Sequence, residues 1–245
     1  MLDALLAPLV REVVYPRHGT RVPPDGSMHE LVVDGTVLRG WVVNPGRDRV
    51  LLYFGGNGER LDLWQEVVAR WFPGHTTYLM AYRGYGASDG RPSQPALTAD
   101  AVALVDHVRG RHPGAPVDLI GRSLGSGVAM QVAAQRDVAH VVLVTPFDSL
   151  VATAADLVPH LPVATLIEDH WDSAALAPHL DVPVLVVRGG RDAVVRPERT
   201  DRLVEALAAP TVVSYPDADH EDISDDPGYW PAIVDFLDGS SPPGA

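Results

Sequence analysis

The chain has 245 residues, 46% of them apolar, no cysteine and a formal net charge of −13. A chain of this size can bury one substantial core, which predicts a single domain over residues 1–245, and the lack of cysteine excludes disulfides, thiolate nucleophiles and cysteine-ligated metals. The negative charge argues against nucleic acid as a partner, because binding to a phosphate backbone depends on clustered Lys and Arg.

The first 27 residues are predicted to form an N-terminal extension. Four leucines lie there at helical spacing, namely Leu2, Leu5, Leu6 and Leu9. They indicate a helix docked on the core, with a membrane-surface anchor as the less favoured alternative because the polar face lacks the Lys and Arg of interfacial helices. No stretch reaches the roughly 18 apolar residues that cross a bilayer, and Asp3 stands where a secretory signal is basic. We therefore expect a cytoplasmic protein.

Short β-rich runs follow at 30–33 and 37–43, separated by Asp34-Gly35, which is a strong hairpin signal. From residue 50, short apolar runs alternate with amphipathic segments, a rhythm typical of parallel strands joined by crossover helices. The apolar runs lie at 50–54, 77–82, 117–120, 141–145, 184–187 and 211–215. The segments read as helices lie at 59–71, 96–111, 124–136, 198–209 and 229–238. The sequence thus predicts an α/β fold, with a mostly parallel eight-stranded sheet and helices on both faces.

Two segments lie outside this rhythm. Residues 148–180 hold no predicted strand and form either a small helical cap or a long connection. Residues 239–245, GSSPPGA, are expected to be a disordered tail.

The candidate nucleophile is Ser123. The apolar run VDLI leads into Gly121-Arg122-Ser123-Leu124-Gly125 and then into a small-residue helix, which is the strand-turn-helix context of a G-x-S-x-G elbow. The two glycines remove Cβ atoms that would collide with neighbouring backbone on so tight a turn. At the start of the following helix, the free N–H of Leu124 favours a developing oxyanion.

A second oxyanion donor is expected in the loop after the first parallel strand. That loop reads Gly-Gly-Asn-Gly-Glu at 55–59, and we predict that the backbone N–H of Asn57 is the donor. A phosphate-binding loop is disfavoured because no G-K-[ST] follows the glycines.

The candidate base and acid are His220 and Asp192. A serine needs a base to accept its proton and a carboxylate to hold that base in the correct tautomer. His220 follows the last apolar run and Asp192 follows VLVV, so both open at the edge of the sheet where Ser123 lies. Asp148 is the rival acid, since it also follows a buried strand, although it can equally cap the next helix.

Metal ligation is not predicted. Asp169, His170 and Asp172, and the acidic run at 221–226, show no recognised ligand spacing and are interpreted as solvated polar loops.

The sequence resembles the α/β-hydrolase superfamily over residues 28–238, and within it a serine-aminopeptidase-like and depalmitoylase-like branch. The matching phrases are LLYFGGNGE, YRGYGASDG, GRSLGSG, TPFDSL and WDS. Gly55 replaces the histidine usual in that branch. The resemblance implies the triad Ser123, Asp192 and His220, the oxyanion donors Asn57 and Leu124, and no cofactor.

These observations favour a serine hydrolase that cleaves a carboxylic ester or thioester through an acyl-enzyme. The acyl pocket is predicted to be lined by Phe147, Leu150, Leu157, Leu161 and Trp171, although ordinary packing of the 148–180 segment on the core explains these side chains equally well. An aminopeptidase or amidase is the alternative, with Asp156, Glu168 or Asp169 holding a free amino terminus. A binding module of the same fold without turnover is the alternative from another class.

Overall fold

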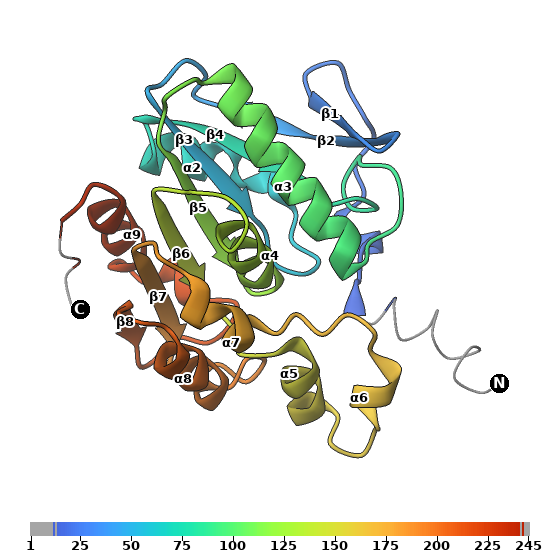
Figure 1. Cartoon of the computed structure of the whole chain (residues 1–245), viewed down its shortest axis with the longest axis vertical. Helices are drawn as coiled ribbons and strands as arrows, with labels where there is room; N and C mark the ends of the chain where they lie inside the picture. Colours follow the sequence, from blue (N-terminus) through green and yellow to red (C-terminus); the bar gives the residue numbers. More distant parts are fainter. Residues whose placement is uncertain (1–11, 13, 241, 243–245) are drawn as a thin grey trace.

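A computed structural model of the chain, which describes residues 12, 14–240 and 242, contains an eight-stranded sheet in the order β1-β2-β4-β3-β5-β6-β7-β8 (Figure 1). The strands are β1 (His29–Val33), β2 (Thr36–Val43), β3 (Arg49–Phe54), β4 (His75–Met80), β5 (Val117–Arg122), β6 (His140–Val144), β7 (Val184–Gly189) and β8 (Thr211–Tyr215). β2 pairs antiparallel with β1 and β4, and every other pairing is parallel. The predicted mostly parallel eight-stranded α/β fold is confirmed.

The β1–β2 hairpin turns at the predicted dipeptide. Asp34 and Gly35 both have positive φ, 48° and 76°, which is the requirement of a type I′ turn. Val33 and Thr36 then face each other as the first pair of the ladder. The hairpin therefore follows from local turn chemistry alone.

Helices cover both faces of the sheet (Figure 1). α3 (Gln94–Arg111), α4 (Leu124–Ala133) and α8 (Pro197–Ala206) pack on one face, and α2 (Gln65–Trp71) and α9 (Tyr229–Leu237) pack on the other. Four 3-10 turns occur in the described part, η1 (His18–Thr20), η2 (Leu61–Trp64), η3 (Ala177–His179) and η4 (Ile223–Asp225). The predicted helix at 59–71 is divided between η2 and α2, because the tight turn at 56–59 delays its start.

Successive side chains of the central strands point to opposite faces of the sheet, which divides the core into two layers. In β3, Leu52 and Phe54 join the layer under α3 and α4, while Leu51 and Tyr53 join the layer under α2 and α9. β6 alternates in the same way. Burying one such side chain contributes about 1.5–3 kcal/mol. Because both faces are covered, these strands read in the sequence as continuous apolar runs.

The 148–180 segment is helical in part, with α5 (Leu150–Leu157), α6 (Val163–Leu166) and α7 (Ser173–Leu176). Ser149, not Asp148, accepts the hydrogen bond that caps α5, from the N–H of Ala152. The segment is hydrogen-bonded to Tyr15 of the N-terminal region. Trp171 Nε1 donates to Tyr15 Oη at 3.1 Å, and Tyr15 Oη donates to Asp169 at 2.8 Å.

The predicted N-terminal leucine helix lies outside the described residues, as does most of the predicted tail. Among the residues that are described, no helix is long and apolar enough to cross a membrane. The cytoplasmic location stays a prediction.

Candidate active site

The candidate residues gather at one edge of the sheet. Ser123 follows β5, Asp192 follows β7, and His220 follows β8. The loop with Asn57 follows β3. Since these strands are parallel, their carboxyl ends meet at the same edge, which is where open α/β sheets place their ligands.

Ser123 has a strained backbone, with φ 51° and ψ −116°. The turn is close to its neighbours on both sides. A Cβ added at Gly121 would lie 2.3 Å from the carbonyl oxygen of Gly125, and one added at Gly125 would lie 1.9 Å from the carbonyl oxygen of Phe54. The N–H of Ser123 donates to the carbonyl of Val144 at 2.9 Å, which ties the turn to β6. This geometry, costly for a non-glycine residue, persists because the surrounding backbone over-determines it.

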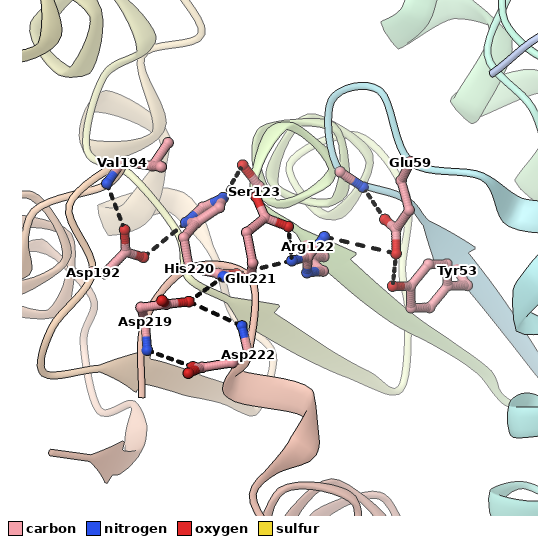
Figure 2. Close-up of polar contacts among 11 residues, drawn as sticks. Tyr53, Glu59, Arg122, Ser123, Asp192, Val194, Asp219, His220, Glu221 and Asp222 are labelled. Carbon is pink, nitrogen blue, oxygen red and sulfur yellow. Dashed lines mark hydrogen bonds and ion pairs between the residues drawn. The ribbon is translucent and has the colours of Figure 1, made fainter. Parts of the chain in front are cut away.

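Ser123, His220 and Asp192 form one hydrogen-bonded chain (Figure 2). Ser123 Oγ lies 3.0 Å from His220 Nε2, and His220 Nδ1 lies 2.8 Å from Asp192 Oδ2. His220 and Asp192 are 6% and 5% exposed. A serine hydroxyl, an imidazole and a buried carboxylate in this order can move a proton from the hydroxyl to the imidazole.

The second oxygen of Asp192 is held by backbone. Oδ1 accepts the N–H of Val194 at 2.9 Å and the N–H of Val195 at 2.7 Å. The carboxylate therefore has one oxygen for its own loop and the other for the imidazole.

The loop of His220 is shaped by the acidic run that surrounds it (Figure 2). Asp219 Oδ1 accepts the N–H of Glu221 at 2.8 Å and that of Asp222 at 3.0 Å, while Asp222 Oδ1 accepts the N–H of Asp219 at 2.6 Å. In the other group considered for metal ligation, at 169–172, Asp172 caps α7 and Asp169 accepts a hydrogen bond from the hydroxyl of Tyr15. These carboxylates are thus engaged in turns, caps and a buried hydrogen bond.

The two predicted oxyanion donors are on the turns that flank Ser123. Among the described residues, the backbone N–H groups of Asn57 and Leu124 form no hydrogen bond. The side chain of Asn57 is fixed on both sides, since its Nδ2 donates to the carbonyl of Val14 at 2.5 Å and its Oδ1 accepts the hydroxyl of Tyr85 at 2.8 Å. An unbonded N–H on a fixed turn is the form that an oxyanion donor requires.

A pocket of about 250 Å³ opens beside Ser123 and His220. Its other lining residues are Gly56, Asn57, Gly58, Glu59, Trp64, Arg122, Glu221 and Ser224. The lining combines backbone of the β3 loop with charged side chains.

The five side chains predicted to line an acyl pocket do not line this one. Phe147 and Trp171 are each 1% exposed and pack on α4, where a Cβ added at Gly127 would lie 3.1 Å from both rings. Leu150 packs against the same core layer, while Leu157 and Leu161 are 51% and 55% exposed. Here the structure favours the packing interpretation for Phe147 and Trp171, because each ring fills space against a glycine of the nucleophile helix.

The other candidate carboxylates lie away from His220. Asp148 contacts Arg199 at 3.2 Å, and Asp156 contacts the same guanidinium at 2.7 Å. Glu168 is exposed. Of the two rival acids, Asp192 is the neighbour of His220, while Asp148 pairs with Arg199.

Sequence reasoning missed Glu59 and Arg122, which lie inside the recognised motifs. Arg122 ends a buried strand and its side chain is only 10% exposed, while that of Glu59 is 6% exposed. For Arg122, a charged residue just after an apolar run was the available signal, because such a group is rarely buried without a partner.

Comparisons with known proteins agree with this architecture. A family model described as serine aminopeptidase, S33 matches residues 46–167. An uncharacterized protein of Mycobacterium tuberculosis is 37% identical over 226 residues, which cover 86% of this chain and 80% of the relative. A solved esterase of Pyrococcus furiosus superposes with a TM-score of 0.73 at 19% identity, covering 89% of this chain and 95% of that one. An enol-lactonase from Burkholderia xenovorans LB400 gives a TM-score of 0.67 at 18% identity, with coverages of 86% and 100%.

Proposed function

The chain belongs to the α/β-hydrolase superfamily, and on that premise we propose that it is a serine hydrolase that cleaves a carboxylic ester or thioester through an acyl-enzyme. One observation carries the proposal. Ser123 Oγ lies 3.0 Å from Nε2 of His220, and Nδ1 of the same ring lies 2.8 Å from the buried carboxylate of Asp192.

In the first half of the proposed reaction, Ser123 Oγ attacks the carbonyl carbon and His220 Nε2 takes the hydroxyl proton. Asp192 holds the imidazole with Nδ1 protonated and stabilises the imidazolium that forms. The N–H groups of Asn57 and Leu124 receive the carbonyl oxygen as it becomes negative.

In the second half, His220 gives its proton to the departing alcohol or thiol, which leaves an ester on Ser123. Water then attacks this ester, with His220 taking its proton; His220 returns that proton to Ser123 Oγ as the carboxylic acid is released, which restores the starting state. The fixed turns at Asn57 and Ser123 support this cycle because their donors need no rearrangement as charge develops.

Labelling with a fluorophosphonate probe tests the proposal directly. Wild-type protein should form one adduct at Ser123, located by mass spectrometry, and should hydrolyse p-nitrophenyl esters. Ser123→Ala should form no adduct and lose several orders of magnitude in kcat. Ser93→Ala removes a hydroxyl that only caps α3, and it should behave as wild type. A folded wild-type protein that forms no adduct would overturn the proposal in favour of a binding module.

An aminopeptidase or amidase remains the second candidate because the matching family model carries that description and because Glu221, whose side chain is 79% exposed, lines the pocket. Of the carboxylates suggested by the sequence, Asp156 pairs with Arg199 and Asp169 accepts the hydroxyl of Tyr15. Turnover of aminoacyl p-nitroanilides without turnover of p-nitrophenyl esters would favour this candidate over the esterase.

A further inference from the structure

A largely buried ion pair lies in the wall of the pocket beside Ser123. Arg122 directly precedes Ser123, and its Nη1 lies 3.8 Å from Glu59 Oε1 (Figure 2). Both side chains are at least nine-tenths buried, at 10% and 6% exposed. Burying two charges carries a desolvation penalty that their attraction often fails to repay, so a pair at this position needs a reason beyond stability.

Glu59 fixes the turn that carries the proposed oxyanion donor. Its Oε2 accepts the N–H of Gly56, and its Oε1 accepts the hydroxyl of Tyr53 at 3.0 Å. The N–H of Glu59 donates back to the carbonyl of Gly56 at 3.2 Å, which closes the turn around Asn57. The carboxylate therefore accepts the hydrogen bond of the Gly56 N–H, while the N–H of the next residue, Asn57, has no partner among the described residues.

Arg122 reaches from beneath this turn to the loop of the proposed base. Its Nη2 donates to the backbone carbonyl of His220 at 2.8 Å and faces Glu221 at 3.3 Å. At its other end, Nη1 would lie 3.2 Å from a Cβ added at Gly56, so the guanidinium packs directly against the β3 loop. One rigid planar group thus spans two loops that are far apart in the sequence.

We propose that Glu59 and Arg122 act together as positioning residues, which hold the Asn57 oxyanion turn and the His220 loop at a fixed separation on either side of Ser123. The inference rests on the proposed serine-hydrolase function. Neither side chain takes part in bond making. Each acts through backbone, Glu59 on the N–H of Gly56 and Arg122 on the carbonyl of His220.

Burial and mutual attraction act in opposite directions on this pair. Burial raises the pKa of Glu59, and the nearby Arg122 charge opposes that rise. Burial alone would lower the pKa of Arg122, yet Glu59 and its neighbours raise it above the ordinary value. Arg122 thus stays charged, and a charged guanidinium is the form that donates most strongly to a carbonyl.

The opposite edge of the sheet offers a matched control. Arg49 Nη2 also bridges a buried carboxylate and a backbone carbonyl, Asp118 at 2.8 Å and Leu237 at 2.7 Å. This pair lies at the amino ends of β3 and β5, away from Ser123. Arg49→Met breaks the same kinds of contact without touching the site.

The test compares Arg122→Met, the double variant Glu59→Gln/Arg122→Met and Arg49→Met by thermal melting, p-nitrophenyl ester kinetics and the rate of fluorophosphonate labelling. We expect Arg122→Met to lower kcat by about 100-fold with little change in KM, since misplacing a catalytic group by about 1 Å costs that much. The double variant leaves no unpaired buried charge, so it should regain thermal stability while kcat stays low. Arg49→Met should lose stability and keep kcat.

Each other outcome has a definite meaning. A double variant that regains kcat together with its stability would show that the pair only supports the fold, and would overturn the inference. So would an Arg122→Met protein with the kcat of Arg49→Met. A wild-type protein that is neither labelled nor active would overturn the proposed function, and this inference with it.

Discussion

Replacing Asp192 with asparagine should trap the imidazole of His220 in the wrong tautomer. Asp192 Oδ1 accepts two N–H groups, from Val194 and Val195, so an asparagine at this position keeps its carbonyl oxygen there. Its NH2 group then faces His220 Nδ1, which must accept. Nε2 consequently carries the proton and cannot take another from Ser123. We expect kcat to fall about 10⁴-fold, which corresponds to about 5.4 kcal/mol.

Stability separates this effect from unfolding. Asp192→Asn keeps the acceptor for both N–H groups, so its melting temperature should stay near that of wild type. Asp192→Ala leaves the buried N–H of Val195 without its acceptor, a loss of about 1–3 kcal/mol, or about 2–12 °C in a chain of this length. The assay is steady-state ester hydrolysis with melting curves on each variant. An Asp192→Asn protein that keeps kcat within tenfold of wild type would refute the orienting role.

Three further predictions concern the fold and the exposed apolar side chains. Gly125→Ala should abolish cooperative thermal unfolding measured by circular dichroism, because its Cβ would lie 1.9 Å from the carbonyl oxygen of Phe54. Burial would raise the pKa of Asp118, but its hydrogen bonds with His75, His140 and Arg49 lower it overall. Its contribution to stability is therefore present above about pH 4 and is lost as the pH falls further. In urea titrations, Asp118→Asn should lower the neutral-pH midpoint and flatten the acid limb, whereas an unchanged acid limb would contradict this. Leu161 is 55% exposed, so Leu161→Ser should change stability by less than about 0.5 kcal/mol and leave kcat/KM for acetyl esters unaltered.

The strands and their edge were predictable because their causes are local. Continuous apolar runs indicate strands covered on both faces, and β3, β5 and β8 begin within one residue of the predicted positions. Parallel strands joined by helices place all their carboxyl ends together, so Ser123, Asp192 and His220 could be assigned to one edge from chain order alone. The turn at Asp34 and Gly35 likewise needed only its own two residues.

The choice between Asp148 and Asp192 could not be made with certainty from such patterns, since each carboxylate follows a buried parallel strand. In the structure, α8 places Arg199 beside Asp148, while Asp192 faces His220. Which side chain a carboxylate contacts depends on how helices pack on the sheet. The spacing of apolar residues along the chain does not predict such a contact.

The sequence by itself determined the sheet, the edge where the candidate residues lie and their order along the chain. Only the tertiary structure decided the pocket lining and the contact from Arg122 to the carbonyl of His220, two residues separated by 98 positions. The physical reason is that secondary structure and strand order depend on short-range periodicity, whereas a buried charge finds its partner only when distant loops have packed together.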